Sequence, residues 1–441
     1  MGITKANTKK AKTLNIDDDY FLSFRKLNIT NSCNSQVGST QSTILLERVN
    51  KYAIQSAARS LLGGRLNICC RATAKKRGPI DIFKTVTDKF YYSGLMSCGS
   101  VWVCPVCAVK ITELRRAELT HAVDDWCSSG QSVLHLTLSV RHKAHDLLAN
   151  TLDLLTRAFR VMTNSKTWKR IAKKITLSGR VRSLEVSYGS NGWHPHFHLL
   201  LFIGTPLDPS TMCDQEQVLL ALWKETCESV GLRTVNKYGL SLEDGSQAAS
   251  YIIKNPMTSG RRGGHVTPFE LLSKHMDGDH NADRLFKEFA AAFSGKRQLI
   301  WSKGLRNRFS LRAELTVTKI VLAQSDEDDL FARISTEVWF EVRKNEKRGE
   351  LLDVCKKGID ALHRYLQQFA PTNHIKQKSN VSLPVDVSGN NKPSVKGKKE
   401  ETVYCDNYCN NAKVRQVEII QRCLICESYR KIDTARGCRD P

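Results

Sequence analysis

No stretch of this sequence approaches the roughly 18 consecutive apolar residues that a membrane-spanning helix needs. The N-terminal segment MGITKANTKKAKTLN is basic and polar, and it lacks the apolar core of a secretion signal. The sequence also has no internal repeat of fixed period, which argues against a repeat array. We therefore expect a cytoplasmic protein that has no membrane partner.

Acidic residues are scarce as well. The 441 residues include 44 Asp and Glu against 67 Lys and Arg, which leaves a net charge of +23. Because this excess is spread through segments that are expected to fold, it indicates an anionic partner, and nucleic acid is the commonest one. The alternative is a basic protein whose charge serves only its solubility. The chain is long enough for two or three domains with a sizeable core.

The periodicity of apolar residues predicts helices and strands mixed within one domain. Helices are expected at residues 44–64, 111–130, 145–163 and 216–231, and on both sides of a turn at residues 277–279. Strands are expected at residues 133–140, 181–189 and 196–204.

The stretch GWHPHFHLLLF carries three histidines at alternate positions. In an extended strand alternate side chains share one face, so His194, His196 and His198 point the same way and can chelate one ion. Pro195 implies that regular pairing starts only after it or that the strand lies at an edge, which favours His196 and His198 as ligands over His194. Glu185 on the preceding strand is a candidate third ligand, since hairpin pairing could bring it near the histidines. The alternatives are incidental surface histidines and a solvent-facing carboxylate.

Nine of the fifteen cysteines fall in two clusters with short, metal-type spacings, as expected of reduced thiols in a cytosolic protein. In the first cluster, Cys104 and Cys107 form a CxxC, Cys98 is a third candidate ligand, and either Cys69 or Cys70 is the fourth. We predict a structural zinc there, with buried unliganded thiols as the alternative. The second cluster has the spacing C-x3-C-x13-C-x2-C and predicts a second zinc module formed by Cys405, Cys409, Cys423 and Cys426.

Several of these strings resemble one protein family. HPHFHLLLF resembles the paired-histidine motif of the HUH endonucleases, and LHLTLSVRH is similar to the apolar strand motif that precedes it in plasmid rolling-circle replication proteins. CGSVWVCPVCAVKI and FKEFAAAFSGKRQLIWSKGL also resemble that family. The resemblance covers about residues 65 to 365 in matching order. It implies an α+β fold with a central antiparallel sheet, flanking helices and small zinc-bound segments.

The resemblance also implies a nucleophile. The third motif of the family is a tyrosine followed three residues later by a lysine on a helix, and SYIIKN supplies Tyr251 and Lys254. Some members place a second tyrosine or a glutamate four residues before the nucleophile to end replication. Here that position is Gln247, which can do neither, and the nearby Glu243 is a substitute candidate.

We therefore predict a replication initiator that nicks plasmid origin DNA with Tyr251, using Mg²⁺ or Mn²⁺ at the histidines. The resemblance implies a bacterial host whose helicase and DNA polymerase extend the nicked strand. The alternatives are a catalytically inactive zinc-dependent DNA-binding regulator and a related transposase or relaxase. The expected segments are a basic arm (1–44), a helix with the first cysteine cluster (45–125), the catalytic domain with a helical extension (126–370), a linker (371–400) and the second cysteine module (401–441).

Overall fold

The computed structural model describes residues 41–74, 78–248, 252–253, 265–311 and 328–369, and for residues 41–50 it describes the backbone alone. The chain divides into two units, Met1–Val387 and Ser388–Pro441, and every described residue belongs to the first unit.

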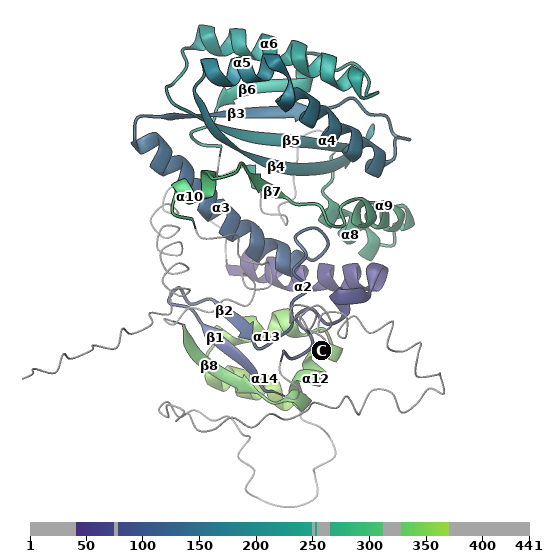
Figure 1. Cartoon of the computed structure of the whole chain (residues 1–441). Coiled ribbons are helices and arrows are strands. Elements are labelled where there is room, and N and C mark those ends of the chain that lie inside the picture. Colours follow the sequence, from purple (N-terminus) through teal and green to yellow (C-terminus); the bar gives the residue numbers. More distant parts are fainter. Residues whose placement is uncertain (1–40, 75–77, 249–251, 254–264, 312–327, 370–441) are drawn as a thin grey trace, which may run out of the picture. The chain divides into compact units, whose positions relative to one another are not determined.

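An antiparallel sheet of five strands forms the centre of the larger half of this unit (Figure 1). The strand order is β6-β3-β5-β4-β7, so β5 lies in the middle. The predicted α+β class with a central antiparallel sheet is thereby confirmed. The strands are β3 (Ser132–Ser139), β4 (Leu177–Gly189), β5 (Gly192–Ile203), β6 (Leu240–Asp244) and β7 (Leu299–Trp301).

The hairpin of β4 and β5 determines how the histidine strand is placed. Gly189 pairs with Gly192 across a two-residue turn, and Gly192 has a φ of +85°, which glycine adopts without strain. Pairing with β4 continues through Pro195, so the expectation that pairing starts only after this residue holds for β3 but is wrong for β4, and the alternative of an edge strand is wrong because β5 lies in the middle of the sheet. Counted from the turn, Pro195 stands at a non-hydrogen-bonded position opposite Val186, and the pairing of β5 with β3 begins only at His196. The missing N–H of Pro195 therefore removes no bond to either neighbour.

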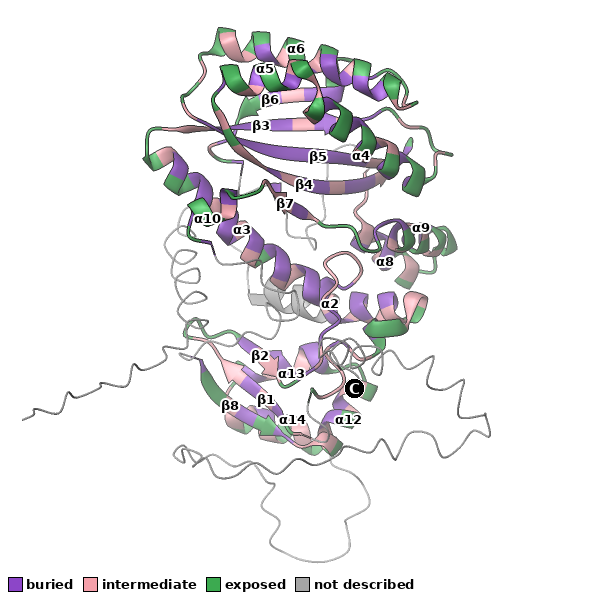
Figure 2. Ribbon diagram, viewed as in Figure 1, coloured by how far each residue is buried: buried purple, intermediate pink, exposed green. Residues whose placement is uncertain are grey.

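One face of this sheet is apolar. Leu136, Phe197 and Leu199 on it are at most 1% exposed. Helices α4, α5 and α6 cover this face through contacts with β5, β4 and β6, and Figure 2 shows β5 buried along nearly its whole length. The helix bounds are α4 (Leu148–Asn164), α5 (Lys166–Lys174) and α6 (Pro209–Ser229).

On the opposite face of the sheet, the side chains are apolar at one end of the strands and polar further along. At one end Val133, Leu200 and Phe202 pack beneath α3 (Pro105–Ser128), where the ring of Trp126 contacts Phe202 with centroids 5.5 Å apart. Further along the same face the side chains change from apolar to polar, and the predicted histidines lie there. The apolar half anchors α3, while the polar half is available for chemistry.

The helices predicted from apolar periodicity are confirmed, while the helix expected around Tyr251 and Lys254 lies outside the described residues. Side-chain caps mark the start of several helices. Ser165, Asp208 and Asp279 accept hydrogen bonds from backbone N–H groups in the first turns of α5, α6 and α9. Helix α3 begins six residues before the predicted start, because Pro105 suits the first position of a helix. The remaining bounds in this part of the chain are α2 (Gln41–Leu62), α8 (Pro268–Met276), α9 (His280–Ala292) and α10 (Leu305–Arg308).

A second antiparallel sheet has the order β2-β1-β8. Strand β8 lies inside the segment that the sequence assigns to the catalytic domain, yet it pairs with β1 next to the first cysteine cluster. Helix α13 packs on α2, so the residues that follow β8 are also joined to the N-terminal helix. The bounds are β1 (Ile80–Lys84), β2 (Phe90–Ser93), β8 (Asp329–Ile334), α12 (Thr336–Lys344), α13 (Arg348–Cys355) and α14 (Ile359–Gln367).

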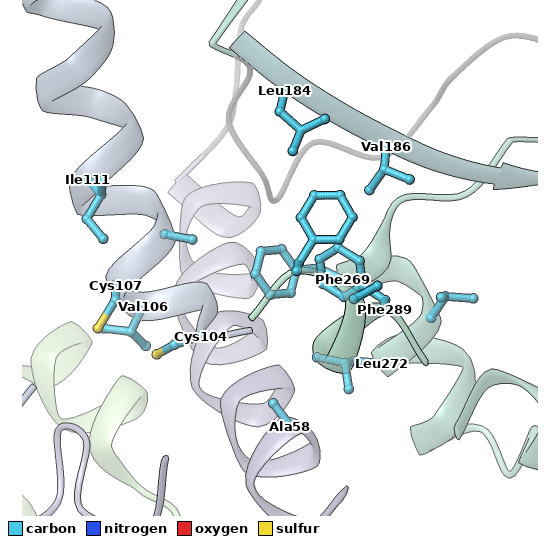
Figure 3. Close-up of a cluster of buried hydrophobic side chains, with 14 of the residues drawn as sticks. Ala58, Cys104, Val106, Cys107, Ile111, Leu184, Val186, Phe269, Leu272 and Phe289 are labelled. Atoms are coloured by element: carbon cyan, nitrogen blue, oxygen red, sulfur yellow. The ribbon is translucent and has the colours of Figure 1, made fainter. Parts of the chain in front are cut away.

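The main hydrophobic core runs from the large sheet to the cysteine cluster. Figure 3 shows Leu184 of β4, Phe269 and Phe289 of α8 and α9, and Val106 and Ile111 of α3 in this core. The cysteines of the first cluster therefore belong to the same core that supports the histidine strand. Among the described helices, none has both the length and the apolar character that crossing a membrane requires.

Candidate functional site

Strand pairing brings two of the predicted histidines to the predicted glutamate. Glu185 on β4 lies directly opposite His196 on β5, and His198 is two residues further along the same face. The Nε2 atom of His198 is 3.1 Å from Oε2 of Glu185, and the Nε2 atom of His196 is 3.6 Å from the same oxygen. One possible ligand atom from each residue lies within 4.8 Å of the others, so this group could hold a metal ion.

The histidine rings are oriented by contacts on their other nitrogens. Nδ1 of His198 lies 3.0 Å from Nε2 of His135 and 3.2 Å from Oγ1 of Thr137. Nδ1 of His196 lies 3.2 Å from the carbonyl oxygen of His194. Both rings thus direct Nε2 toward Glu185. Metal-binding histidines are commonly oriented in this way by a second partner.

Burial suits this group to an ion. His196 and His198 are 7% and 9% exposed, and the side chain of Glu185 is 13% exposed. A carboxylate so far removed from water needs a compensating charge or hydrogen bonds. Two imidazole nitrogens and one carboxylate oxygen can bind a divalent ion and leave positions open for water or a phosphate oxygen.

His194 lies outside this group. Its Nδ1 is 2.9 Å from Nε2 of His142, and burial together with the neighbouring histidines lowers the pKa of His194 to about 3. His194 and His196 border an open pocket of about 1030 Å³. The other residues that line this pocket are Val140, Arg141, His142, Lys143, Ser187, Asn191, Tyr238 and His265.

Tyr251 and Lys254 lie outside the described residues. Their described neighbours Ala248, Ile252 and Ile253 are at most 4% exposed and belong to the apolar cluster beneath α3. That cluster contains side chains of β5 on the same face as the histidines. The chain on both sides of Tyr251 is therefore packed against the sheet face that carries the metal-binding group.

His135 is a site residue that the sequence argument missed. It is 4% exposed on β3, between His198 and Glu243 of β6, whose Oε2 is 3.9 Å from Nδ1 of His135. Glu243, the substitute for Gln247, therefore lies beside the imidazole that contacts His198. A histidine within the apolar strand LHLTLSV was the signal that could have identified it.

The first cysteine cluster forms a second group that could hold a metal ion, namely zinc. The Sγ atom of Cys69 lies 3.7 Å from that of Cys104 and 3.6 Å from that of Cys107, which is also 3.6 Å from Sγ of Cys98. Four thiolates at about 2.3 Å from a tetrahedral zinc would be about 3.8 Å apart. Cys70 is not in this group. Of the two candidates for the fourth ligand, the structure therefore favours Cys69.

Helix α3 positions two of these thiols. Cys104 is its N-cap and Cys107 lies in its first turn. The Nε2 atom of Gln55 donates to Sγ of Cys104 at 3.3 Å, and Oγ of Ser97 lies 3.3 Å from Sγ of Cys107. Burial raises the pKa of the Cys104 thiol, while hydrogen bonds from the neighbouring thiols lower that of Cys107. The second predicted cluster, Cys405, Cys409, Cys423 and Cys426, lies outside the described residues.

Comparisons with known proteins point to replication. A family model described as a replication protein matches residues 96–349, which is more than half of the chain. A relative named Protein rep, from Streptomyces lividans, is 29% identical over 294 residues, covering 49% of this chain and 64% of the relative. A protein named Neomycin resistance protein, from Streptomyces cyanogenus, is 32% identical over 136 residues, covering 25% of this chain and 31% of the relative.

The chain therefore spans less than two thirds of the length of either relative. No solved structure matches it significantly. The matched range 96–349 contains β3, β4 and β5 and most of the first cysteine cluster, with Cys69 outside it.

Proposed function

This chain belongs to the replication protein family, and from that membership we propose that it initiates rolling-circle replication by nicking one strand at a plasmid origin. The observation that carries the proposal is the grouping of Glu185, His196 and His198 on one face of the central sheet. A regulator that only binds DNA has no need of a buried ligand set with open coordination positions.

We assign the attack to Tyr251. Its phenolic oxygen forms a bond to the phosphorus of a DNA phosphodiester while the bond from phosphorus to the 3′ oxygen breaks. The phenolic proton is lost, the 3′ oxygen gains a proton, and the products are a 5′-phosphotyrosine and a free 3′-OH. One phosphate ester replaces another, so rejoining needs no external energy source.

The residues around the nucleophile would have to compensate for its weakness. A phenol with an ordinary pKa of about 10 is mostly protonated at neutral pH, and Lys254, three residues later, is the proposed source of stabilising positive charge. Glu185, His196 and His198 would hold Mg²⁺ or Mn²⁺. When bound, such an ion neutralises charge on the phosphate oxygens and holds the phosphate in line for displacement.

The packing beside the nucleophile supports this assignment. Ala248 and Ile252 flank Tyr251 in the sequence, and both lie in the apolar cluster on the histidine face of the sheet. Glu243 is the proposed substitute for Gln247 in ending a replication cycle, because its carboxylate lies 3.9 Å from His135, whose ring contacts His198 at 3.0 Å.

The proposal names partners by their chemistry. The free 3′-OH would prime a host DNA polymerase, and a host helicase would unwind the duplex ahead of it. The net charge of +23 would favour binding of both duplex and single-stranded origin DNA. Zinc at the first cysteine cluster would hold the start of α3 in place, and the second cluster would hold another zinc ion.

The test incubates the full chain with supercoiled plasmid carrying its own origin, with and without Mn²⁺ or Mg²⁺. We expect metal-dependent relaxation and a covalent protein–DNA adduct. Tyr251→Phe should abolish both relaxation and the adduct because it lacks the nucleophile. His198→Ala should abolish both because it lacks a metal ligand. Tyr91→Phe, in the second sheet, and His280→Ala, whose side chain is 96% exposed on α9, are the matched controls.

Each outcome has a definite meaning. Origin binding without nicking by the wild-type protein would overturn the proposal in favour of the regulator. An adduct formed by Tyr251→Phe would mean that another tyrosine attacks, and Tyr238 in the pocket beside His196 would be the first to replace. Cleavage at a transposon end or at a transfer origin in place of a replication origin would indicate a transposase or a relaxase.

A further inference from the structure

The pocket beside His196 has features that the metal-binding group does not use. The described residues that line it include no carboxylate, although the chain contains 44 acidic residues. Arg141 and Lys143 are exposed at its rim, and neither has an ion-pair partner in the described part of the chain. Two cations without an ion-pair partner beside one pocket favour an anion there.

Tyr238 gives the pocket an aromatic surface. It is 76% exposed, more than any other large hydrophobic side chain of the described residues. Its backbone is nevertheless fixed, because Oδ1 of Asn236 accepts a hydrogen bond from the Tyr238 N–H at 3.0 Å. Gly239 also packs so closely on Val235 that an added Cβ would lie 2.5 Å from it. The exposed ring, which has the Lys237 ammonium 5.1 Å from its centroid, is carried by a turn that leads directly into β6.

A neighbouring contact holds the cationic rim against the histidines. A Cβ added to Gly192 would lie 2.9 Å from Cα of Ala144, so the turn of the β4–β5 hairpin is pressed against the segment that carries Arg141 and Lys143. His142 in this segment then contacts His194 at 2.9 Å. The pocket is consequently continuous with the face that holds Glu185, His196 and His198.

We propose that this pocket binds one nucleotide of the single DNA strand next to the phosphate that is cut. Tyr238 stacks on the base, and Arg141 and Lys143 bind phosphates of the same strand. Stacking on an aromatic ring tolerates every base, and cations that follow the backbone add affinity without sequence preference. This assignment rests on the proposed nicking function, since it places the strand relative to the metal-binding group.

The test separates base from backbone with two probes of equal length, oligothymidylate and an oligomer of abasic deoxyribose phosphate. Affinities of the full chain are measured by fluorescence anisotropy without added divalent metal, so that no cleavage occurs. Tyr238→Ala should weaken oligothymidylate binding by about 5- to 100-fold and leave abasic binding unchanged. Tyr238→Trp should restore the preference for the base-bearing probe. Phe340→Ala, which removes a 48% exposed ring on α12, is the matched control and should change neither affinity.

The cations give a different readout. Arg141→Ala combined with Lys143→Ala should weaken both probes equally and reduce the slope of log affinity against log salt by about 1.4, or about 0.7 for each phosphate contact. Lys287→Ala, an exposed lysine on α9, is the matched control and should leave the slope unchanged.

Equal loss of both probes in Tyr238→Ala, or no loss of either, would overturn the stacking assignment. An unchanged salt slope in the double variant would overturn the phosphate assignment. If the wild-type chain nicks the origin but one of these assignments fails, the proposed function stands and only the proposed role of the pocket is refuted. The converse result is base-dependent binding without origin nicking. It would support the pocket as a binding site for single-stranded DNA and refute the proposed nuclease activity.

Discussion

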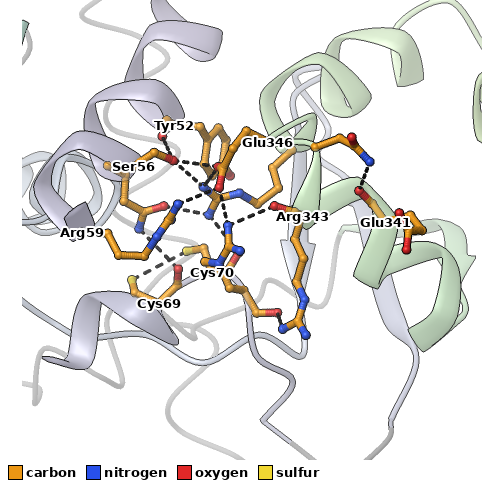
Figure 4. Close-up of polar contacts among 12 residues, drawn as sticks. Tyr52, Ser56, Arg59, Cys69, Cys70, Glu341, Arg343 and Glu346 are labelled. Atoms are coloured by element: carbon orange, nitrogen blue, oxygen red, sulfur yellow. Dashed lines mark hydrogen bonds and ion pairs between the residues drawn. The ribbon is translucent and has the colours of Figure 1, made fainter. Parts of the chain in front are cut away.

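Replacing Glu346 by glutamine tests how the residues after β8 are fixed to the N-terminal helix. The carboxylate of Glu346 accepts hydrogen bonds from Arg59 at 2.6 Å and from the hydroxyl of Ser56 at 2.7 Å (Figure 4). It also accepts hydrogen bonds from Arg71 at 2.5 Å and Arg348 at 2.7 Å. Three guanidinium groups thus converge on one carboxylate. Replacing Glu346 by glutamine removes the negative charge and leaves the three guanidinium groups close together without it.

The size of the effect follows from the pKa of this carboxyl group. Burial alone would raise it, but Arg348, the hydroxyl of Ser56 and Arg59 outweigh burial and lower the pKa of Glu346 from 4.5 to about 2. A shift of that size corresponds to about 3 kcal/mol at most. Because the side chain is 37% exposed, solvent screens the ion pairs, and we expect Glu346→Gln to cost about 1–2 kcal/mol at pH 7.

The pH dependence has a definite sign. Since folding lowers the pKa of Glu346, its stabilisation is fully present above about pH 4.5 and is lost as pH falls toward 2. Urea denaturation of wild type and Glu346→Gln should therefore show a difference that is constant from pH 7 to pH 5 and shrinks below pH 4.5.

The matched control is Glu341→Gln on α12. In the described part of the chain this carboxylate forms one ion pair, with Lys344 at 3.6 Å, and its replacement should cost less than about 0.5 kcal/mol. An equal effect of the two substitutions, or a Glu346→Gln effect that does not shrink in acid, would refute the reasoning.

Three further changes probe other parts of the molecule. Cys107→Ala should lower the zinc content by about one ion per chain in elemental analysis. Replacing the exposed Cys213 should leave the zinc content unchanged. Unchanged zinc in Cys107→Ala would mean that the four thiols bind no ion. Gly192→Ala would place a Cβ 2.9 Å from Cα of Ala144 at a residue whose φ is +85°. It should therefore lower the free energy of unfolding in urea by about 1–3 kcal/mol. No change in stability would mean that the hairpin turn adjusts without cost. Glu185→Gln should weaken Mn²⁺ binding in calorimetric titration by about tenfold or more, and unaltered affinity would exclude Glu185 as a ligand.

Local patterns predicted much of the large sheet and its helices. Period-two alternation identified β3, β4 and β5, and capping and apolar spacing identified α2, α4, α6, α8 and α9. The alternation also placed His196 and His198 on one face, because successive side chains of a strand point to opposite sides. These features depend on the backbone geometry of a few neighbouring residues, so a single sequence is enough to predict them.

Long-range pairings could not be predicted in this way. The strand β8 pairs with β1, about 250 residues earlier, because both bury apolar side chains in the same hydrophobic core. Neither strand carries a signal that names its partner. Likewise, the spacing of adjacent thiols cannot distinguish Cys69 from Cys70, since the path of the chain after the helix decides which Sγ atom turns toward Cys104.

The sequence by itself determined the kinds of residue available for chemistry and their local alternation: three histidines on one strand face, a CxxC at a helix start and a large excess of positive charge. Only the tertiary structure decided which of them meet. The register of the β4–β5 hairpin placed Glu185 opposite His196, and the pairing with β3 added His135 behind His198. Such registers are set by how both faces of the sheet bury their apolar side chains, which is a property of the whole packed fold.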